Sequence, residues 1–414
     1  GYEQVYETTD SVDRGVRQRF RILGARLLGT EFIVDGGVDM LATAMNVSTR
    51  TGSLPYMSQA LTFNLIIDNF EVIDWAFIVR LVLSFLCIVL AYDTVSRELE
   101  SGTLRTVLAN SLSRLAFLGG KGLAHLVTVL FASLLGAIVS LAILSFTGTI
   151  HVNLQLAGTC AVFLVGVVLY CSLYLGVAMG VSALVRTSAT ASVVLVMIWA
   201  VLTVVLPQAS ALIGRQSHDV PFRPWEAAYD YFQGTAVALH DRGITLRPGE
   251  DGRIDGYQQE LQYAAALREA EKEEERLIRE MMDRQAGQYR VARAVNLLSP
   301  GYALQYSLES MLGVGVSARD ALEERMWRYR RNLRESFQQI DTQDPDSPHV
   351  LFFPGYLSRA PMDPARIPRF EDHVWGLTGG HARSMVPMLV LLLEAVASGL
   401  FAVWALNRAD LTRD

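Results

Sequence analysis

Acidic and hydroxyl side chains gather around one glycine in the segment from Asp93 to Lys121. Glu98 and Glu100 stand just before Gly102, and Thr103 follows it. Apolar residues then recur at helical spacing, at Leu104, Val107, Leu108, Leu112 and Leu115. This pattern predicts a short amphipathic helix along a membrane surface, with a polar face that binds a soluble partner. The alternative is an ordinary solvated loop, because any reversal between membrane spans must be polar.

A second carboxylate with chemical potential is Glu394, which lies well inside an apolar stretch. A carboxylate at that depth is costly, so it must face a cavity, meet a partner or be protonated. One interpretation is an intramembrane polar site on a substrate path. The other is a packing residue that is hydrogen-bonded or protonated between helices.

Catalytic and cofactor motifs are absent from the sequence. Leu118-Gly-Gly-Lys-Gly122 lacks the earlier glycine and the Ser or Thr of a phosphate-binding loop, so we expect no ATP site of that type. There is no His-Glu-x-x-His motif and no Gly-x-Ser-x-Gly elbow, and Cys87, Cys160 and Cys171 all lie in apolar stretches. We therefore expect no enzyme activity, no metal and no cofactor in this chain. A net charge of -6 argues against nucleic-acid binding.

The elements that position these residues are apolar stretches long enough to cross a bilayer of roughly 30 Å. They run over 75–92, 122–146, 155–183, 189–213 and 384–406. The fold class expected is therefore an all-α polytopic membrane protein with five visible transmembrane helices. Gly176 and Gly180 form a small-residue face that permits close helix packing, while Asp74 and Arg80 near one end of the first span are expected to be structural.

The short loops indicate how the chain crosses the membrane. Basic residues occur at 97, 105, 114, 121, 186, 408 and 413, whereas 147–154 has none. By the positive-inside rule the segment 93–121 and the C-terminus are cytosolic, in a cell (inner or plasma) membrane. The segment 1–72 is then extracytoplasmic, and the chain begins at Gly1 rather than Met. We expect a sixth, preceding transmembrane helix; a cleaved signal peptide is the alternative.

A long polar insertion occupies 214–384, ahead of the last span and tail at 385–414. We expect it to be extracytoplasmic and mainly helical. Residues 257–298 contain no proline and predict one long helix, or two end to end, which Ser299-Pro-Gly301 ends. An apolar stripe over 317–340 predicts a second helix that packs on the first as a hairpin. The proline-rich 341–370 is expected to be irregular, its aromatic residues anchoring it at the lipid interface or on the helices, or docking a partner. In 1–72, the stretches 19–28 and 38–45 suggest short helices or strands.

The stretch Tyr92-Asp-Thr-Val-Ser-Arg-Glu-Leu-Glu-Ser-Gly-Thr-Leu104, followed by Gly120-Lys121, resembles the coupling segment of ABC-2-type transporter permeases. The tail Asn407-Arg-Ala-Asp-Leu411 resembles the polar end of these subunits. The insertion, with Ser299-Pro-Gly-Tyr302, is similar to a subgroup described as multicopper-enzyme-maturation permeases. One departure is Leu112, where the family commonly has proline.

The resemblance implies a function for the chain. It would be the transmembrane permease subunit of an ABC transporter, a homodimer or heterodimer in membrane lipid, coupled to cytosolic ABC ATPase subunits that bind ATP and Mg. The residues implied in ATPase coupling are Arg97, Glu98, Leu99, Glu100, Ser101, Gly102, Thr103 and Leu104. The alternative is an ATPase-driven mechanotransmitter or scaffold that acts on an extracytoplasmic protein partner through 214–384. The spans contain few polar residues, which favours lipid-like or peptide cargo.

Overall fold

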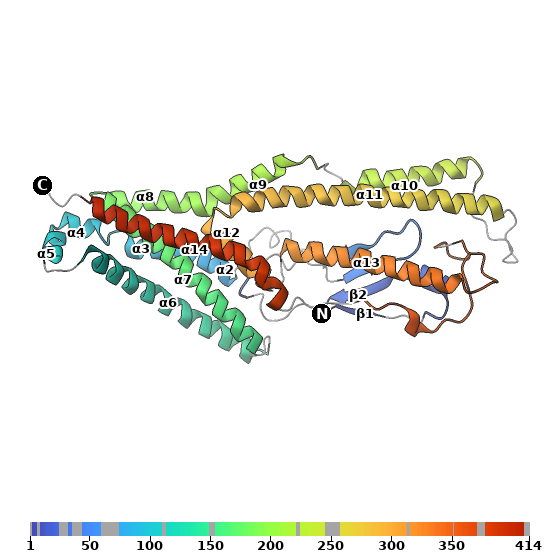
Figure 1. The fold of residues 1–414 in the computed structure, drawn as a ribbon, viewed down its shortest axis with the longest axis horizontal. Coiled ribbons are helices and arrows are strands. Elements are labelled where there is room, and N and C mark those ends of the chain that lie inside the picture. Colours follow the sequence, from blue (N-terminus) through green and yellow to red (C-terminus); the bar gives the residue numbers. More distant parts are fainter. Residues whose placement is uncertain are drawn as a thin grey trace.

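A computed structural model describes residues 2–5, 9–24, 32–34, 44–58, 74–109, 113–148, 154–220, 224–244, 257–312, 315–350, 352–370 and 377–409. The molecule is elongated, with a bundle of apolar helices at one end and long polar helices with a small sheet at the other (Figure 1). We call these two parts the membrane half and the polar half. The tail predicted after the last span is described as far as residue 409, and 410–414 lie outside the described residues.

The expected membrane spans are confirmed. Within the described residues, five helices are long and apolar enough to cross a membrane, over Trp75–Glu100, Arg114–Phe146, Leu156–Leu184, Ser188–Ser217 and Met385–Arg408. The first span comprises α2 (Trp75–Phe77), η2 (Ile78–Leu83), α3 (Ser84–Ala91) and α4 (Ser96–Glu100). The second and third are α6 (Arg114–Phe146) and α7 (Leu154–Leu184). The fourth comprises α8 (Ser188–Ala200), η3 (Val201–Val205) and α9 (Leu206–Ser217), and the fifth lies in α14 (Leu377–Arg408). Both η2 and η3 are π-helical segments.

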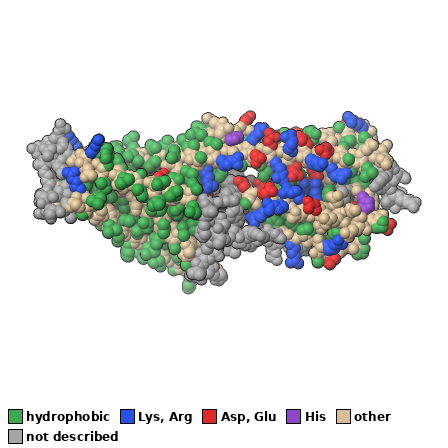
Figure 2. Space-filling model, viewed as in Figure 1, with side chains coloured by type: hydrophobic (Ala, Val, Ile, Leu, Met, Phe, Trp, Pro, Cys, Tyr) green, Lys and Arg blue, Asp and Glu red, His purple; other side chains and the backbone are tan. Residues whose placement is uncertain are grey.

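The surface of the membrane half is hydrophobic. Figure 2 shows hydrophobic side chains over this half, Lys and Arg at its far tip, and mixed charges over the polar half. On α6, Phe131 and Leu135 are 70% and 56% exposed, which water would penalise and hydrocarbon would not. The exposed apolar belt therefore marks the surface that meets lipid.

Three long helices form most of the polar half: α10 (Pro224–Asp241), α11 (Tyr257–Asn296) and α13 (Val316–Asp341). The long helix predicted before Ser299 is a single helix of 40 residues, about 60 Å at ~1.5 Å per residue. It runs alongside α9 and α10 (Figure 1).

A four-stranded sheet packs under α13, and the sequence left helix and strand open for this region. Its strands β1 (Tyr2–Val5), β2 (Phe20–Gly24), β3 (Ala44–Val47) and β4 (Tyr56–Ser58) are antiparallel in chain order, and α1 (Val12–Arg17) lies between the first two. Alternate residues Ile22, Met45 and Val47 are fully buried. They join Phe337 of α13 in one core, so the sheet buries its apolar face against that helix.

The predicted hairpin of 257–298 with 317–340 is realised differently. A further helix, α12 (Pro300–Leu312), lies between the two and returns to the membrane half, where Ala303, Leu304 and Leu308 are buried. The apolar stripe of α13 is divided between the sheet and Ile278 of α11. The helices α11 and α13 are therefore not a hairpin joined by a short turn. They are held together by side chains that pack in a shared core.

The proline-rich segment is irregular, as expected, with one short turn η4 (Pro364–Arg366). Its three aromatic residues lie in cores of the polar half: Phe352 packs with the α13 cluster, and Phe353 and Tyr356 pack with residues of α10 and α11. They anchor the segment on the helices.

A buried ion pair also ties these elements together. Glu271 of α11 and Arg330 of α13 are each 3% exposed and lie 2.5 Å apart. Arg334 donates to Glu271 at 2.8 Å and to the Thr49 carbonyl at 3.0 Å. Removing one partner from such a set leaves a buried charge without compensation, so the set holds α11, α13 and the sheet in one arrangement.

Candidate functional site

The segment 93–121, which we call the reversal segment, lies at the tip of the membrane half farthest from the polar half (Figure 1). The structure contains two short helices here, α4 and α5 (Thr103–Ala109), where the sequence predicts one amphipathic helix. They meet at Gly102, whose φ of 69° is a left-handed conformation that glycine adopts without steric cost. Leu104 is 1% exposed, whereas Leu115 lies in α6 and is 66% exposed. The predicted face is therefore divided, as far as its residues are described, between α5 and α6, and Leu112 lies outside the described residues.

Glu98 connects this segment to the second span. Its carboxylate accepts a hydrogen bond from Lys121 Nζ at 2.9 Å and another from the Thr103 hydroxyl. Lys121 also donates to the Thr94 carbonyl at 3.0 Å, so one ammonium group joins α6 to both ends of the α4 region. Charge-assisted bonds of this kind are stronger than neutral ones. The carboxylate therefore acts within the chain.

Glu100 connects the segment to the fourth span. One carboxylate oxygen accepts from the Ser188 backbone N–H at 2.6 Å, and the other from the Ser188 hydroxyl at 3.1 Å. Ser188 is the first residue of α8, where unpaired N–H groups and the helix dipole favour a negative charge. Glu100 thus holds the start of α8 against α4.

The remaining spans are tied to the same segment. In α7, the Ser182 hydroxyl accepts from the backbone N–H groups of Val95 and Ser96, at 3.1 and 3.0 Å. Arg114 donates to the carbonyls of Leu406 and Asn407 at 3.0 and 3.1 Å, at the end of α14. A cation beside the last carbonyls of a helix is favourable. The reversal segment, which contains the start of the second span, is therefore hydrogen-bonded to the third, fourth and fifth described spans.

The exposed edge of the segment is polar. Arg97 has a side chain that is 78% exposed, and Ser101, Gly102 and Thr103 are exposed beside it. Leu99 is half-buried. The structure brings the eight predicted coupling residues together at one tip. Their surroundings differ, however. The two carboxylates are bonded within the chain, whereas Arg97 and Ser101–Thr103 form an edge that is exposed.

The predicted intramembrane residue Glu394 lies on α14 and is half-buried. Its Oε2 atom is buried and has no hydrogen-bond partner among the described residues. It interacts electrostatically with Tyr174 of α7, whose hydroxyl is 3.3 Å from that of Thr203. The structure therefore places Glu394 on α14 within electrostatic range of Tyr174 on α7.

The predicted small-residue face carries the contact between α7 and α14. A Cβ on Gly176 would lie 3.0 Å from the Ser398 carbonyl carbon, and one on Gly180 would lie 2.5 Å from the Phe401 ring. Close approach of two membrane helices depends on such residues.

An apolar groove of about 390 Å³ opens between the first, second and third spans. Its lining includes Phe32, Trp75, Ile138, Leu164 and Val167. Ile138 and Leu164 are 54% and 40% exposed, so the groove opens onto the hydrocarbon-facing surface of the membrane half. A hydrocarbon chain is the ligand that such a lining accepts.

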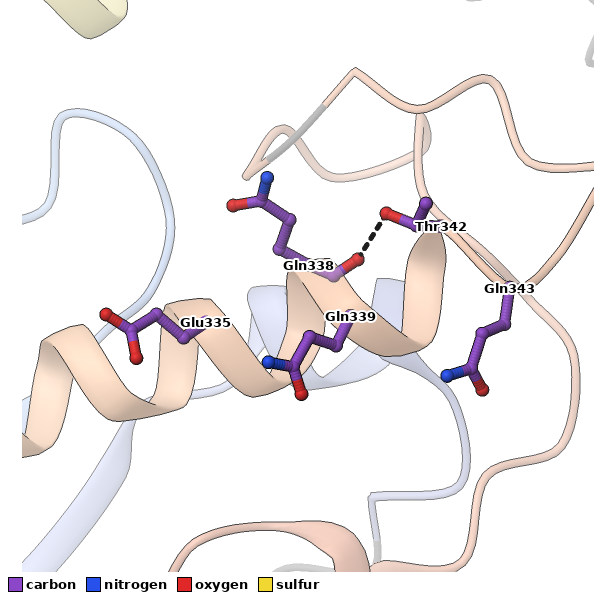
Figure 3. A pocket seen from close by; sticks show the side chains of 5 residues that line it. All are labelled: Glu335, Gln338, Gln339, Thr342 and Gln343. Carbon is purple, nitrogen blue, oxygen red and sulfur yellow. Dashed lines mark hydrogen bonds between the residues drawn. The ribbon is translucent and has the colours of Figure 1, made fainter.

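In contrast, a polar depression at the end of α13 has no convergent chemistry. Figure 3 shows Glu335, Gln338, Gln339, Thr342 and Gln343 pointing in different directions from one helix end. The Thr342 hydroxyl donates to the Gln338 carbonyl at 2.7 Å, a bond within the helix. Among the residues that the structure describes, no group of three or more His, Cys, Asp or Glu side chains could hold a metal ion.

Sequence reasoning missed a polar cluster at the opposite end of the spans. Arg80, treated as structural, donates to Gln305 of α12 at 2.7 Å and lies over the Tyr302 ring at 4.8 Å. The available signals were an arginine inside a span and the Ser299-Pro-Gly break. Arg80 and the residues after this break come together only because α12 returns to the spans, which is a tertiary feature.

Comparison with known proteins identifies the family of the chain. No curated protein matches the chain. The model of a family described as ABC-2 family transporter protein matches residues 20–411. This match covers nearly all of the chain, including every span, the reversal segment and the insertion. The chain therefore belongs to the ABC-2 transporter family.

Proposed function

We propose that this chain is a permease subunit that a separate ATPase drives through the reversal segment. The observation that carries the proposal is the bonding pattern at the tip: one short segment, which contains the start of the second span, is hydrogen-bonded to the third, fourth and fifth spans and leaves a polar edge exposed. A force applied to that edge would reach the second span through Lys121 and the fourth through Ser188. It would reach the third through Ser182 and the fifth through Arg114.

In this proposal the tip is cytosolic and the polar half is extracytoplasmic. Basic side chains at the tip, with Arg97 and Lys121 among them, support this orientation. ATP and Mg are bound by the ATPase, and the active assembly contains two permease subunits, identical or different. The cargo is lipid-like, which the apolar groove and the scarcity of polar groups in the spans support.

The exposed edge is the place to test ATPase binding. Arg97→Glu reverses a charge on a side chain that is 78% exposed and makes only a 3.6 Å pair with Asp93. If this edge contacts the ATPase, the dissociation constant should rise about 10-fold or more, as for a charge reversal within an interface. The matched control is Arg284→Glu, which reverses the charge of an exposed side chain on α11 and should leave ATPase binding unchanged.

The measurement begins with affinity purification from native membranes, which identifies the copurifying ATPase and lipids. Binding and ATP turnover of each variant are then compared in the purified complex. Equal ATPase binding by the Arg97→Glu and unaltered chains would refute contact at this edge. Absence of any copurifying ATPase would refute the proposal as a whole.

The second candidate function is a mechanotransmitter that acts on an extracytoplasmic partner. Exposed apolar residues on α10 favour it: Tyr229 and Val237 are 58% and 56% exposed. Deleting 214–384 would not test it cleanly, because α12 belongs to the core of the membrane half. Changing Tyr229 and Val237 to Ser is sharper. The scaffold function, which moves no solute, requires that this variant lose a copurifying partner. Retention of the partner, or solute flux in vesicles, would contradict it.

A further inference from the structure

The first and fourth spans are interrupted by π-helical segments at η2 and η3. A π segment accommodates an extra residue in a helical turn and is often found at functional sites. Both segments contact α12. The two irregular turns therefore meet the helix that leads out to α11.

In each π segment a backbone carbonyl accepts a hydrogen bond from a side chain outside that segment. The Arg80 carbonyl of η2 accepts from the Tyr170 hydroxyl of α7 at 2.9 Å, and from the Ser84 hydroxyl at 2.6 Å. The Leu202 carbonyl of η3 accepts from the Ser299 hydroxyl at 2.7 Å. Buried backbone groups need such partners, so these hydroxyls stabilise the irregular turns. Ser299 does so from the turn that precedes α12.

The side chain of Arg80 is held by α12 as well. It is 5% exposed, donates to Gln305 at 2.7 Å and stacks on Tyr302 at 4.8 Å. Its stem occupies the space beside Gly301, where a Cβ would lie 2.5 Å from the Arg80 Cγ. Gln305 in turn donates to Glu309 at 2.8 Å. The contact is therefore polar, tight and specific to this register.

At its other side, α12 is bound to the last turns of α11. Asn296 donates to the Tyr306 hydroxyl at 3.2 Å, and the Arg293 guanidinium lies 4.8 Å from the centre of the Tyr306 ring. Only Leu297, Leu298 and Ser299 separate the two helices. Displacement of α12 must therefore move the end of α11.

We propose that α12 is a mechanical link that converts rearrangement of the first and fourth spans into movement of α11. Conversion of a π turn to α-helix removes one residue from the turn and shifts the flanking helix by about 1.5 Å, with rotation. A shift in η2 or η3 would displace Arg80 or the Leu202 carbonyl from its partner on α12. The link rests on the proposed function, which supplies the motion, and identifies α11 as the element that receives it.

The test uses hydrogen exchange in the full chain, first without the ATPase. The double variant Ser299→Ala, Gln305→Leu removes both bonds to the spans. Exchange of backbone amides in 300–312 should become roughly 10-fold faster, the factor that corresponds to about 1.4 kcal/mol. The matched control is Ser192→Ala, Gln285→Leu, which changes a half-buried residue of α8 and an exposed residue of α11 that do not contact α12 through these side chains. Ser299→Thr, which keeps the hydroxyl, should preserve protection. Unchanged exchange of 300–312 in the double variant would overturn the link.

The second measurement compares the purified ATPase complex with ADP and with a non-hydrolysable ATP analogue. In the unaltered chain, exchange should change both in the reversal segment and in 277–296. In the double variant the change in the reversal segment should remain and the change in 277–296 should disappear. A response of 277–296 that survives in the double variant refutes the link. If exchange in the reversal segment is the same with both nucleotides, the proposed function is refuted instead, and the first measurement still decides the link.

Discussion

Replacing Gly176 with alanine should separate α7 from α14, the most extensive helix contact of the membrane half. The added Cβ would lie 2.7 Å from the Ser398 hydroxyl oxygen, 3.1 Å from its Cβ and 3.0 Å from its carbonyl carbon. The hydroxyl can rotate away, but the carbonyl carbon is backbone and moves only with the helix. Overpacking of this kind costs about 1–3 kcal/mol.

The same helix offers a matched control in Gly158, where an added Cβ would meet nothing within 4 Å. Both substitutions gain about 0.5–1 kcal/mol from the higher helix propensity of alanine. This gain cancels in the comparison. The Gly176→Ala chain should therefore be less stable than the Gly158→Ala chain by the overpacking cost alone, about 1–3 kcal/mol.

Thermal unfolding in detergent with a thiol-reactive fluorescent dye suits this comparison. Cys87 and Cys171 are buried and become reactive when the spans separate. The midpoint should fall for Gly176→Ala and stay level or rise for Gly158→Ala. Equal midpoints for the two variants would refute the argument, because they would show that α14 shifts without cost.

Three further predictions concern charged groups. Burial, and then the charge of Glu271, raise the pKa of Glu274 to about 7 from its usual 4.5, so the folded state binds its proton more tightly than the unfolded state. Stability should therefore fall as pH rises from about 4.5 to 7, by up to about 3 kcal/mol, and Glu274→Gln should abolish that component in unfolding midpoints measured at pH 5 and 8. Glu271→Ala leaves buried guanidinium groups unpaired and should cost about 3–5 kcal/mol by denaturant unfolding, whereas Glu269→Ala, exposed on the same helix, should be nearly neutral. The Glu98–Lys121 pair is about two-thirds buried or more, and a double-mutant cycle with Glu98→Gln and Lys121→Met should show a coupling of about 1 kcal/mol; zero coupling would mean that the bond does not tie α4 to α6.

The spans were predictable from the sequence because composition determines them locally. About 20 apolar residues can satisfy every backbone group in hydrocarbon only as a helix. The long helix over 257–296 was predictable for a related reason, since it lacks proline and its apolar residues keep a helical period. The sheet was not predictable to the same degree, because a strand such as β2 is stabilised by neighbours on β1 and β3.

The candidate site shows the same division. The sequence located Gly102 and the acidic residues beside it in a polar segment between two spans, and placed Glu394 inside a span. It did not predict that the helix breaks at Gly102. It did not reveal that Glu98 and Glu100 are bonded within the chain, because their partners Lys121 and Ser188 are 23 and 88 residues away. A carboxylate has the same local signal whether its partner is another protein or a distant residue of its own chain.

By itself, then, the sequence determined where the membrane-spanning helices lie, that 257–298 and 317–340 are mainly helical, and that a polar segment stands between the first two spans, since each depends on a continuous stretch of residues. Only the tertiary structure decided that α12 returns from the polar half to contact the first and fourth spans, and that one short segment binds the third, fourth and fifth spans. These contacts join residues far apart in the chain, and the free energy of a hydrogen bond depends on the final position of both partners.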